Sequence, residues 1–212
     1  MSYTTQRYPI PQTTLRTRIE VKRSRFIATA TYTPDIEQSN NFIACVKEEY
    51  ADANHNCWAR VFGAPGSTEH AGMSDDGEPQ GAAGKPMLTA LLYADIGDTT
   101  VVVSRYFGGI KLGKGGMARA YTDALLQVLE RMPLEEKISY TELHMYVEYP
   151  LFNMVERILP AYEARIDSCD FGVGINLHLQ VPIEQRAELI RHLTELSAGA
   201  IRITAAQQDM DT

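Results

Sequence analysis

A glycine-rich segment flanked by basic residues is the part of the sequence whose residue types most directly indicate chemistry. Five glycines fall within the nine residues 108–116, and four basic side chains surround them. Glycine has no Cβ, so such a segment lets an anion approach the backbone closely. A helix that begins here adds unpaired amides and the positive end of its dipole. The segment therefore predicts an anion site formed by Arg105, Gly108, Gly109, Lys111, Gly113, Lys114, Gly115, Gly116 and Arg119.

The same segment matches most of the phosphate-binding loop of nucleotide-hydrolysing proteins. From Gly108 it reads G-x-x-x-x-G-K, and it lies between an expected strand and an expected helix. The next residue in that motif is Ser or Thr, whose hydroxyl binds Mg²⁺, but here it is Gly115. Nucleotide hydrolysis is therefore disfavoured. Two interpretations stay open: contacts to a phosphate backbone, and a tight packing turn with solvated lysines.

A second cluster places Asp75, Asp76 and Glu78 within four residues, and His55 could join them. Such carboxylates could serve as a general acid and base or bind a cation. Turn formation and helix capping are the stronger explanation of these carboxylates, so we expect no metal centre and no cofactor. Cys57 shares a strand face with His55, which permits Cys/His nucleophilic catalysis, although a small buried thiol is the simpler interpretation.

The elements that must position these residues follow from hydrophobic spacing. We expect a flexible or loosely docked arm over residues 1–12 and two strands within residues 14–33, joined by a turn near 22–24. A helix should follow Pro34, with Thr33 as its N-cap and Ile36 at the start of its buried face. The rest of this half consists of a strand over 55–62, a loop over 63–81 and a helix from Lys85, followed by the strand, glycine-rich segment and helix from 99 to about 133.

A boundary is predicted at residues 133–136, because the element order changes there. The remaining pattern is strand, helix, strand, strand, helix, strand, which is the ferredoxin-like order. The fold class is therefore α+β with two domains, residues 1–134 and 137–206, followed by an acidic tail over 205–212. The expected elements of the second domain cover residues 140–149, 150–162, 164–171, 175–181, 183–197 and 200–204.

Charge and cysteine content restrict the partners and the compartment. The net charge is −7, with 14 Lys and Arg against 15 Asp and Glu in residues 1–135 and 6 against 12 thereafter. This argues against indiscriminate nucleic-acid binding, although a local basic patch stays possible in the first half. The three cysteines form neither a disulfide framework nor a zinc pattern, and no signal peptide or membrane span is visible. We therefore expect a cytoplasmic protein with no membrane partner.

Several strings of the first domain together resemble the IMPACT/YigZ family. They lie in family order between Lys22 and Tyr121, and the remaining third is similar to the second domain of bacterial members. Two strings are long and specific: D-D-G-E-P-Q-G-A-A-G-K-P from Asp75, and R-Y-F-G-G-I-K-L-G from Arg105. Two shorter ones are K-R-S-R-F-I-A from Lys22 and H-N-C-W-A from His55.

The resemblance implies a first domain with the fold of domain 2 of ribosomal protein S5. It also implies a ferredoxin-like second domain similar to domain V of the translocating elongation factor. Eukaryotic relatives act in translational control through a partner protein that works at the ribosome. They carry a different additional domain, so that partner does not transfer to this chain. For bacterial members the resemblance implies association with nucleic acid or the ribosome.

We therefore expect a protein that binds RNA or a ribosomal surface and modulates translation. The glycines would offer backbone amides, and the basic residues, Lys85 among them, would pair with phosphates. Two alternatives stay open. One is an enzyme that acts on a small phosphorylated or anionic substrate where Asp75, Asp76 and Glu78 meet the glycine-rich segment; it requires a closed pocket. The other is a module that docks a protein partner in translation through its acidic second domain.

Overall fold

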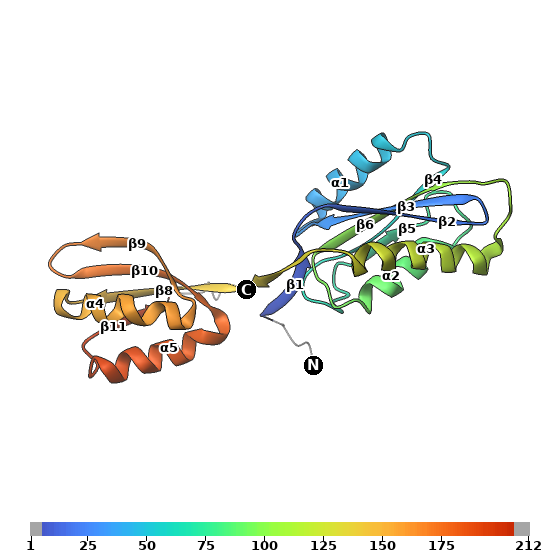
Figure 1. Ribbon diagram of the computed structural model, residues 1–212. Coiled ribbons are helices and arrows are strands. Elements are labelled where there is room, and N and C mark those ends of the chain that lie inside the picture. The colour runs from blue at the N-terminus through green and yellow to red at the C-terminus, as the bar shows by residue number, and fades with distance from the viewer. Residues whose placement is uncertain (1–5, 206–212) are drawn as a thin grey trace. The chain divides into compact units, whose positions relative to one another are not determined.

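The computed structural model describes residues 6–205 and has two compact domains (Figure 1). The first domain comprises residues 1–137 and the second comprises residues 138–212. Both combine helices with sheets, so the expected two-domain α+β class is confirmed. Among residues 6–205, no helix has the length and apolar character needed to cross a bilayer.

An antiparallel five-stranded sheet forms the centre of the first domain. Its strand order is β2-β3-β6-β4-β5. The predicted hairpin is present, because Lys22 and Arg23 both adopt positive φ and turn the chain between its first two strands. A short strand also forms inside the expected loop over residues 63–81. The strands are β2 (Leu15–Val21), β3 (Ser24–Tyr32), β4 (His55–Val61), β5 (Gly72–Ser74) and β6 (Thr99–Tyr106).

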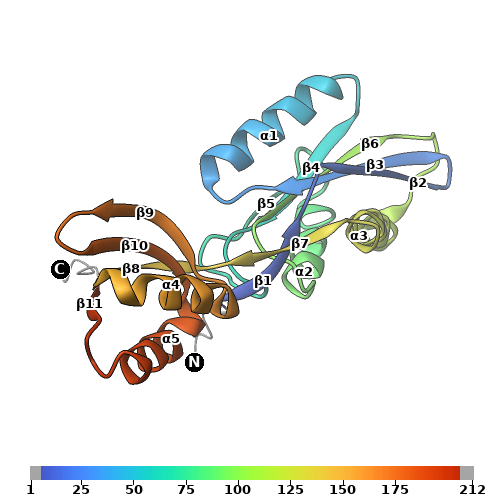
Figure 2. The same ribbon diagram turned by 60° about the vertical axis from the view of Figure 1, so that its left-hand side comes forward.

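Helices cover both faces of this sheet (Figure 2). On one face α2 (Gly84–Leu92) and α3 (Gly113–Glu130) bury the main core. On the other face α1 (Ile36–Glu49) packs Ile43 and Val46 against Val102. Because β6 is covered on both sides, its residues from Thr99 to Arg105 are all buried, which explains its continuous apolar run. The last side chains of β6 are therefore held in place by a rigid strand.

The N-terminal segment forms a strand from Arg7, so of the two alternatives expected for residues 1–12, a flexible or a loosely docked arm, the flexible one is wrong there; residues 1–5 lie outside the described part. Strand β1 (Arg7–Pro11) pairs with β7 (Leu134–Ile138). Tyr8 is buried and donates a hydrogen bond to Asp98 at 2.8 Å. The ammonium of Lys137 lies 2.6 Å from the same carboxylate. These contacts fix the segment, and prolines are tolerated in such an edge strand.

The start of α1 also differs from expectation. Asp35, not Thr33, is the N-cap, and its carboxylate accepts a hydrogen bond from the Gln38 amide at 2.8 Å. Thr33 is buried instead, and its hydroxyl lies 2.7 Å from that of Thr100. Ile36 is half exposed and therefore does not belong to the buried face.

The second domain has the predicted ferredoxin-like order. Its sheet runs β11-β8-β10-β9, and both helices are bounded within one or two residues of expectation, apart from a 3₁₀ turn that ends the first. A separate core forms here, which includes Leu143, Leu177 and Leu189. The acidic tail lies outside the described residues beyond Ala205. The elements are β8 (Tyr140–Val147), α4 (Tyr149–Ile158), η1 (Leu159–Tyr162), β9 (Arg165–Phe171), β10 (Ile175–Pro182), α5 (Ile183–Leu196) and β11 (Arg202–Ala205).

Candidate anion-binding pocket

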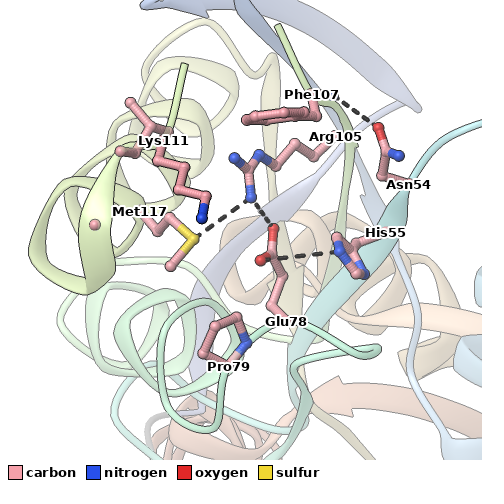
Figure 3. A pocket seen from close by; sticks show the side chains of 10 residues that line it. Asn54, His55, Glu78, Pro79, Arg105, Phe107, Lys111 and Met117 are labelled. Carbon is pink, nitrogen blue, oxygen red and sulfur yellow. Dashed lines mark hydrogen bonds and ion pairs between the residues drawn. The ribbon is translucent and has the colours of Figure 1, made fainter. Parts of the chain in front are cut away.

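A pocket of about 400 Å³ opens in the first domain where β4 begins and β6 ends (Figure 3). The loop before α2 and the start of α3 close its other sides. Its volume is within the range of small-molecule sites. It brings together residues from both of the clusters that the sequence singled out. The lining residues are Asn54, His55, Glu78, Pro79, Arg105, Phe107, Lys111, Leu112, Gly113 and Met117.

Arg105 forms the cationic wall of the pocket. Only 5% of the residue is exposed, yet its guanidinium is not fully satisfied. Nη1 pairs with the Glu78 carboxylate and lies 3.4 Å from the Met117 sulfur, whereas Nε is buried without a hydrogen-bond partner. Buried donors without partners are rare in native proteins, because desolvation without a hydrogen bond is unfavourable. An anionic ligand in the pocket would supply the kind of acceptor that this guanidinium lacks.

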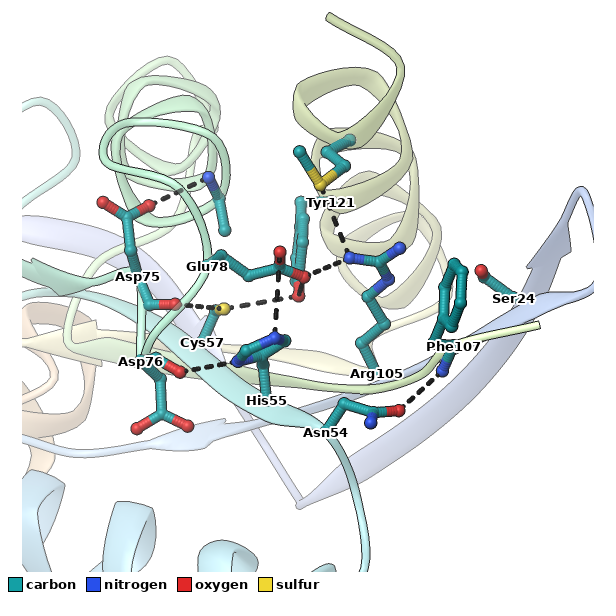
Figure 4. A network of polar contacts seen from close by, with 12 residues as sticks. Ser24, Asn54, His55, Cys57, Asp75, Asp76, Glu78, Arg105, Phe107 and Tyr121 are labelled. Atoms are coloured by element: carbon teal, nitrogen blue, oxygen red, sulfur yellow. Dashed lines mark hydrogen bonds and ion pairs between the residues drawn. The ribbon is translucent and has the colours of Figure 1, made fainter. Parts of the chain in front are cut away.

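Glu78 is held by a buried polar network behind the pocket (Figure 4). Its Oε1 accepts from Arg105 and from the Tyr121 hydroxyl, the latter at 2.8 Å. The Cys57 thiol donates to that hydroxyl at 3.3 Å. Burial raises the pKa of Tyr121 and raises the pKa of Cys57 to about 12. Both groups are therefore protonated at neutral pH, and Cys57 is a buried hydrogen-bonding thiol, not a nucleophile.

His55 presents one particular nitrogen to the pocket. Its Nδ1 lies 2.8 Å from the backbone carbonyl oxygen of Asp76. A carbonyl oxygen only accepts, so Nδ1 carries the proton and the neutral ring has its lone pair on Nε2. That nitrogen lies 3.9 Å from Glu78 Oε2 (Figure 3). The pocket thus has two acceptor atoms side by side, next to the cationic wall.

The glycine-rich segment contributes unequally to this site. Lys111 and Gly113 line the pocket, and α3 begins at Gly113, so the next two predicted glycines, Gly115 and Gly116, belong to the first helical turns. Gly108 has a packing role, because a Cβ on it would lie 2.0 Å from the carbonyl carbon of Arg23. All strand pairs recorded in this sheet are antiparallel, which differs from the parallel setting of nucleotide-hydrolysing loops.

Two of the three predicted carboxylates lie outside the pocket. Asp75 caps α2 by accepting hydrogen bonds from the amides of Gly81, Ala83 and Gly84 at 2.7–2.9 Å. Burial alone would raise the pKa of Asp75, but these amides together lower it below its usual value. The Asp76 carboxylate forms an ion pair with the Lys47 ammonium and accepts a hydrogen bond from the backbone N–H of Asn56. Within residues 6–205, no three His, Cys, Asp or Glu side chains are grouped as a metal centre.

Several predicted basic residues are also elsewhere. Lys85 lines a separate groove between α2 and α3, together with Pro86 and Thr122. Lys114 and Arg119 are exposed on α3 and do not line the pocket, and neither does Gly109. The structure therefore brings together Glu78, Arg105, Lys111, Gly113 and His55 from the predicted set.

Sequence reasoning did not select Asn54, Pro79, Phe107, Leu112 and Met117 as site residues. Phe107 is the most informative of these, because 48% of it is exposed beside the Arg105 guanidinium, which lies 5.7 Å from the ring centroid. Its amide donates to the Asn54 side chain at 2.7 Å, which fixes the aromatic residue at the pocket rim. The sequence signal that could have identified Phe107 is an aromatic residue at the end of a strand, directly before a pair of glycines.

Exposed cations extend beyond the pocket along the same edge of the domain. The β2–β3 turn packs directly on the glycine-rich segment, since the Gly108 amide donates to the Ser24 hydroxyl at 3.1 Å. That turn carries the exposed side chains of Lys22 and Arg23. Arg25 follows, with its guanidinium 4.6 Å from the centroid of the Tyr106 ring. This arrangement places a basic rim, Lys22 and Arg23, beside the pocket, whereas Arg25 and Tyr106 alternate with Phe26 and Arg105 and lie on the other face of the sheet.

Comparisons with known proteins place this geometry in a family. Residues 22–129 match the Impact N-terminal domain, and residues 146–200 match a domain of unknown function (DUF1949). The chain is 36% identical over 189 residues to the IMPACT family member YigZ of Escherichia coli, covering 89% of this chain and 93% of that protein. It is 37% identical to an IMPACT family member of Haemophilus influenzae, covering 92% and 95%. A crystal structure described as a hypothetical protein has a TM-score of 0.68, 35% identity, and coverage of 97% of this chain and 100% of that one.

Proposed function

The chain belongs to the IMPACT family, and on the evidence of its pocket we propose that it binds single-stranded RNA and thereby modulates translation. One nucleotide unit would occupy the pocket, with its phosphate against Arg105 and Lys111 and its base against Phe107. The observation that carries this proposal is the buried Arg105 guanidinium, which lines a pocket of about 400 Å³ and whose Nε lacks a hydrogen-bond partner.

The chemistry of the pocket matches that of a nucleotide. Arg105 is neutralised in part by Glu78, so Lys111 and the start of α3 supply the remaining positive potential. An exposed aromatic ring accepts a base by stacking regardless of sequence, and a guanidinium next to it strengthens the site. A site of this type favours an unpaired nucleotide, because bases within a duplex are not free to stack on protein.

The basic rim favours the binding of an RNA strand over the binding of an isolated nucleotide. Lys22 and Arg23 are exposed next to the pocket and can pair with the phosphates of flanking nucleotides. The net charge of −7 opposes contacts elsewhere on the protein. We therefore expect weak, local and salt-sensitive binding.

A second candidate is an enzyme that acts on a small phosphorylated molecule. The presence of a pocket of about 400 Å³ favours it, as does the Nε2 lone pair of His55, which lies 3.9 Å from Glu78 Oε2 and could accept a proton from a bound substrate. Asp75 and Asp76 would not take part, because both are engaged in the network behind the loop.

Co-sedimentation with ribosomes and with free single-stranded RNA, at two salt concentrations, tests the proposal. Wild type should pellet with RNA-containing particles at low salt and less at high salt. The Lys111→Glu/Lys114→Glu variant should lose this binding, whereas Lys85→Glu, in a different groove, should retain it.

Three results would overturn the proposal. Ribosome binding that survives in the double variant would indicate a protein contact, for which the acidic second domain is the candidate surface. Absence of binding to either particle at low salt would remove RNA as the ligand. Binding of a free phosphorylated metabolite without RNA binding would favour the enzymatic candidate.

A further inference from the structure

We propose that the pocket recognises a free ribose cis-diol, and therefore the 3′-terminal nucleotide of an RNA or a free ribonucleotide, through His55 Nε2 and Glu78 Oε2. This inference rests on the proposed function, because it requires a nucleotide unit in the pocket. Beyond the proposed function, it specifies that the bound sugar is ribose and that the bound nucleotide is at the 3′ end of the RNA or is free. The observation behind it is a pair of acceptor atoms 3.9 Å apart, on two residues that both line the pocket.

Each acceptor is left available by contacts made on its other side. The Asp76 carbonyl holds the His55 proton on Nδ1, so the neutral ring can only accept at Nε2. Glu78 Oε1 accepts from both Arg105 and Tyr121, whereas Oε2 accepts no hydrogen bond from any residue among 6–205. The Tyr121 hydroxyl is itself fixed by Cys57. The geometry of the pair is therefore determined by buried groups, not by the ligand.

Two adjacent acceptors select a ligand that has two adjacent donors. A ribose with free 2′ and 3′ hydroxyls presents two O–H groups on neighbouring carbons, and carboxylates recognise ribose hydroxyls in dinucleotide-binding folds by the same hydrogen bonds. The 2′-hydroxyl is also the group that distinguishes RNA from DNA. An internal nucleotide has lost its 3′ hydroxyl to the phosphodiester, so only a chain end or a free ribonucleotide offers the full diol.

The cationic side of the pocket is consistent with this orientation. Arg105 contacts Glu78 directly, so an anion bound by the guanidinium would lie close to a sugar bound by Oε2. The phosphate on the 5′ side of the terminal nucleotide would then reach Arg105 and Lys111. The preceding nucleotides would leave the pocket toward the basic rim, Lys22 and Arg23.

Fluorescence anisotropy with 5′-labelled oligonucleotides tests the inference. Three probes share one sequence and differ only in the last sugar: a free 2′,3′-diol, a 2′-deoxyribose and a 3′-phosphate. We expect the diol probe to bind about tenfold or more tightly than the other two, since each leaves a buried acceptor without its hydrogen bond. AMP and 2′-deoxy-AMP, each titrated directly into the protein by isothermal titration calorimetry, show whether a free ribonucleotide is an alternative source of the same diol.

A His55→Leu variant should bind all three probes with affinities within about twofold of one another, because one of the two acceptors is gone. Lys85→Gln is the matched control and should keep the preference, because Lys85 lies in a separate groove. Equal affinity of wild type for all three probes would overturn the diol inference but leave RNA binding intact. No binding of any oligonucleotide, with AMP preferred over 2′-deoxy-AMP, would support the diol inference for a free nucleotide and overturn the RNA proposal. No binding of any probe would overturn both.

Discussion

Replacing Glu78 by alanine should destabilise the first domain by about 3–5 kcal/mol, because it leaves a buried guanidinium without its counter-ion. The side chains of Glu78 and Arg105 are only 3% and 7% exposed. Arg105 Nε already lacks a partner, so removal of the carboxylate would leave only the Met117 sulfur near Nη1. Tyr121 would lose its acceptor as well.

Urea unfolding followed by tryptophan fluorescence measures this loss in the relevant domain. Trp58 is the only tryptophan of the chain and lies on β4 within the first domain, so its signal reports that domain alone. With a slope of about 2 kcal/mol per molar urea, the expected loss lowers the transition midpoint by about 1.5–2.5 M. A loss below about 1 kcal/mol would refute the reasoning, because it would show that Arg105 is adequately solvated without Glu78.

A double variant separates function from stability. In Glu78→Met/Arg105→Met both charges are replaced by apolar groups of similar length, and such replacements are often neutral or stabilising. The double variant should therefore be more stable than Glu78→Ala while failing to bind RNA. If it were as unstable as Glu78→Ala, the ion pair would itself be required for folding.

Three further outcomes follow from the same contacts. Gly108→Ala should lower the free energy of unfolding by about 1–3 kcal/mol, because its Cβ would meet the Arg23 backbone at 2.0 Å; an unchanged urea midpoint would contradict this. Iodoacetamide at pH 8 should label the exposed Cys45 and leave Cys57 unmodified until unfolding, since burial raises the pKa of Cys57 to about 12; equal labelling rates by mass spectrometry would disagree. Asp75→Asn should lower the free energy of unfolding by about 1 kcal/mol at pH 7, because the ionised carboxylate caps α2. The pKa of Asp75 is lowered in the folded protein, so this stabilisation is present above the ordinary carboxyl pKa and is lost as pH falls through the lowered pKa. A difference between wild type and variant that stays constant down to pH 2 would contradict this.

The sequence predicted those parts of the fold that depend on local patterns. The turn at Lys22 and Arg23 and the ferredoxin-like element order follow from alternation and helical spacing, which are local properties. Strand β1 was missed because its five residues include two prolines and become ordered only by pairing with β7, more than 120 residues later. Long-range pairing of this kind has no local signal.

The candidate site was predictable in part for the same reason. The motifs marked Arg105, Lys111 and Glu78, because glycines and charges cluster around them. They did not show that Asp75 faces α2 while Glu78 faces the pocket, since that difference depends on how the loop turns between them. Residues that only provide apolar walls, such as Met117, look like ordinary helix core in the sequence.

The most direct test of the central claim is an amide NMR titration of the full chain with a single-stranded oligoribonucleotide at low salt. The account predicts that shifts concentrate at the pocket, on the amides of His55, Phe107, Lys111 and Gly113, and extend to Lys22 and Arg23. It also predicts that the same titration of the Lys111→Gln variant requires more RNA. Shifts confined to the second domain, or none at all at millimolar RNA, would contradict the claim that this pocket binds RNA.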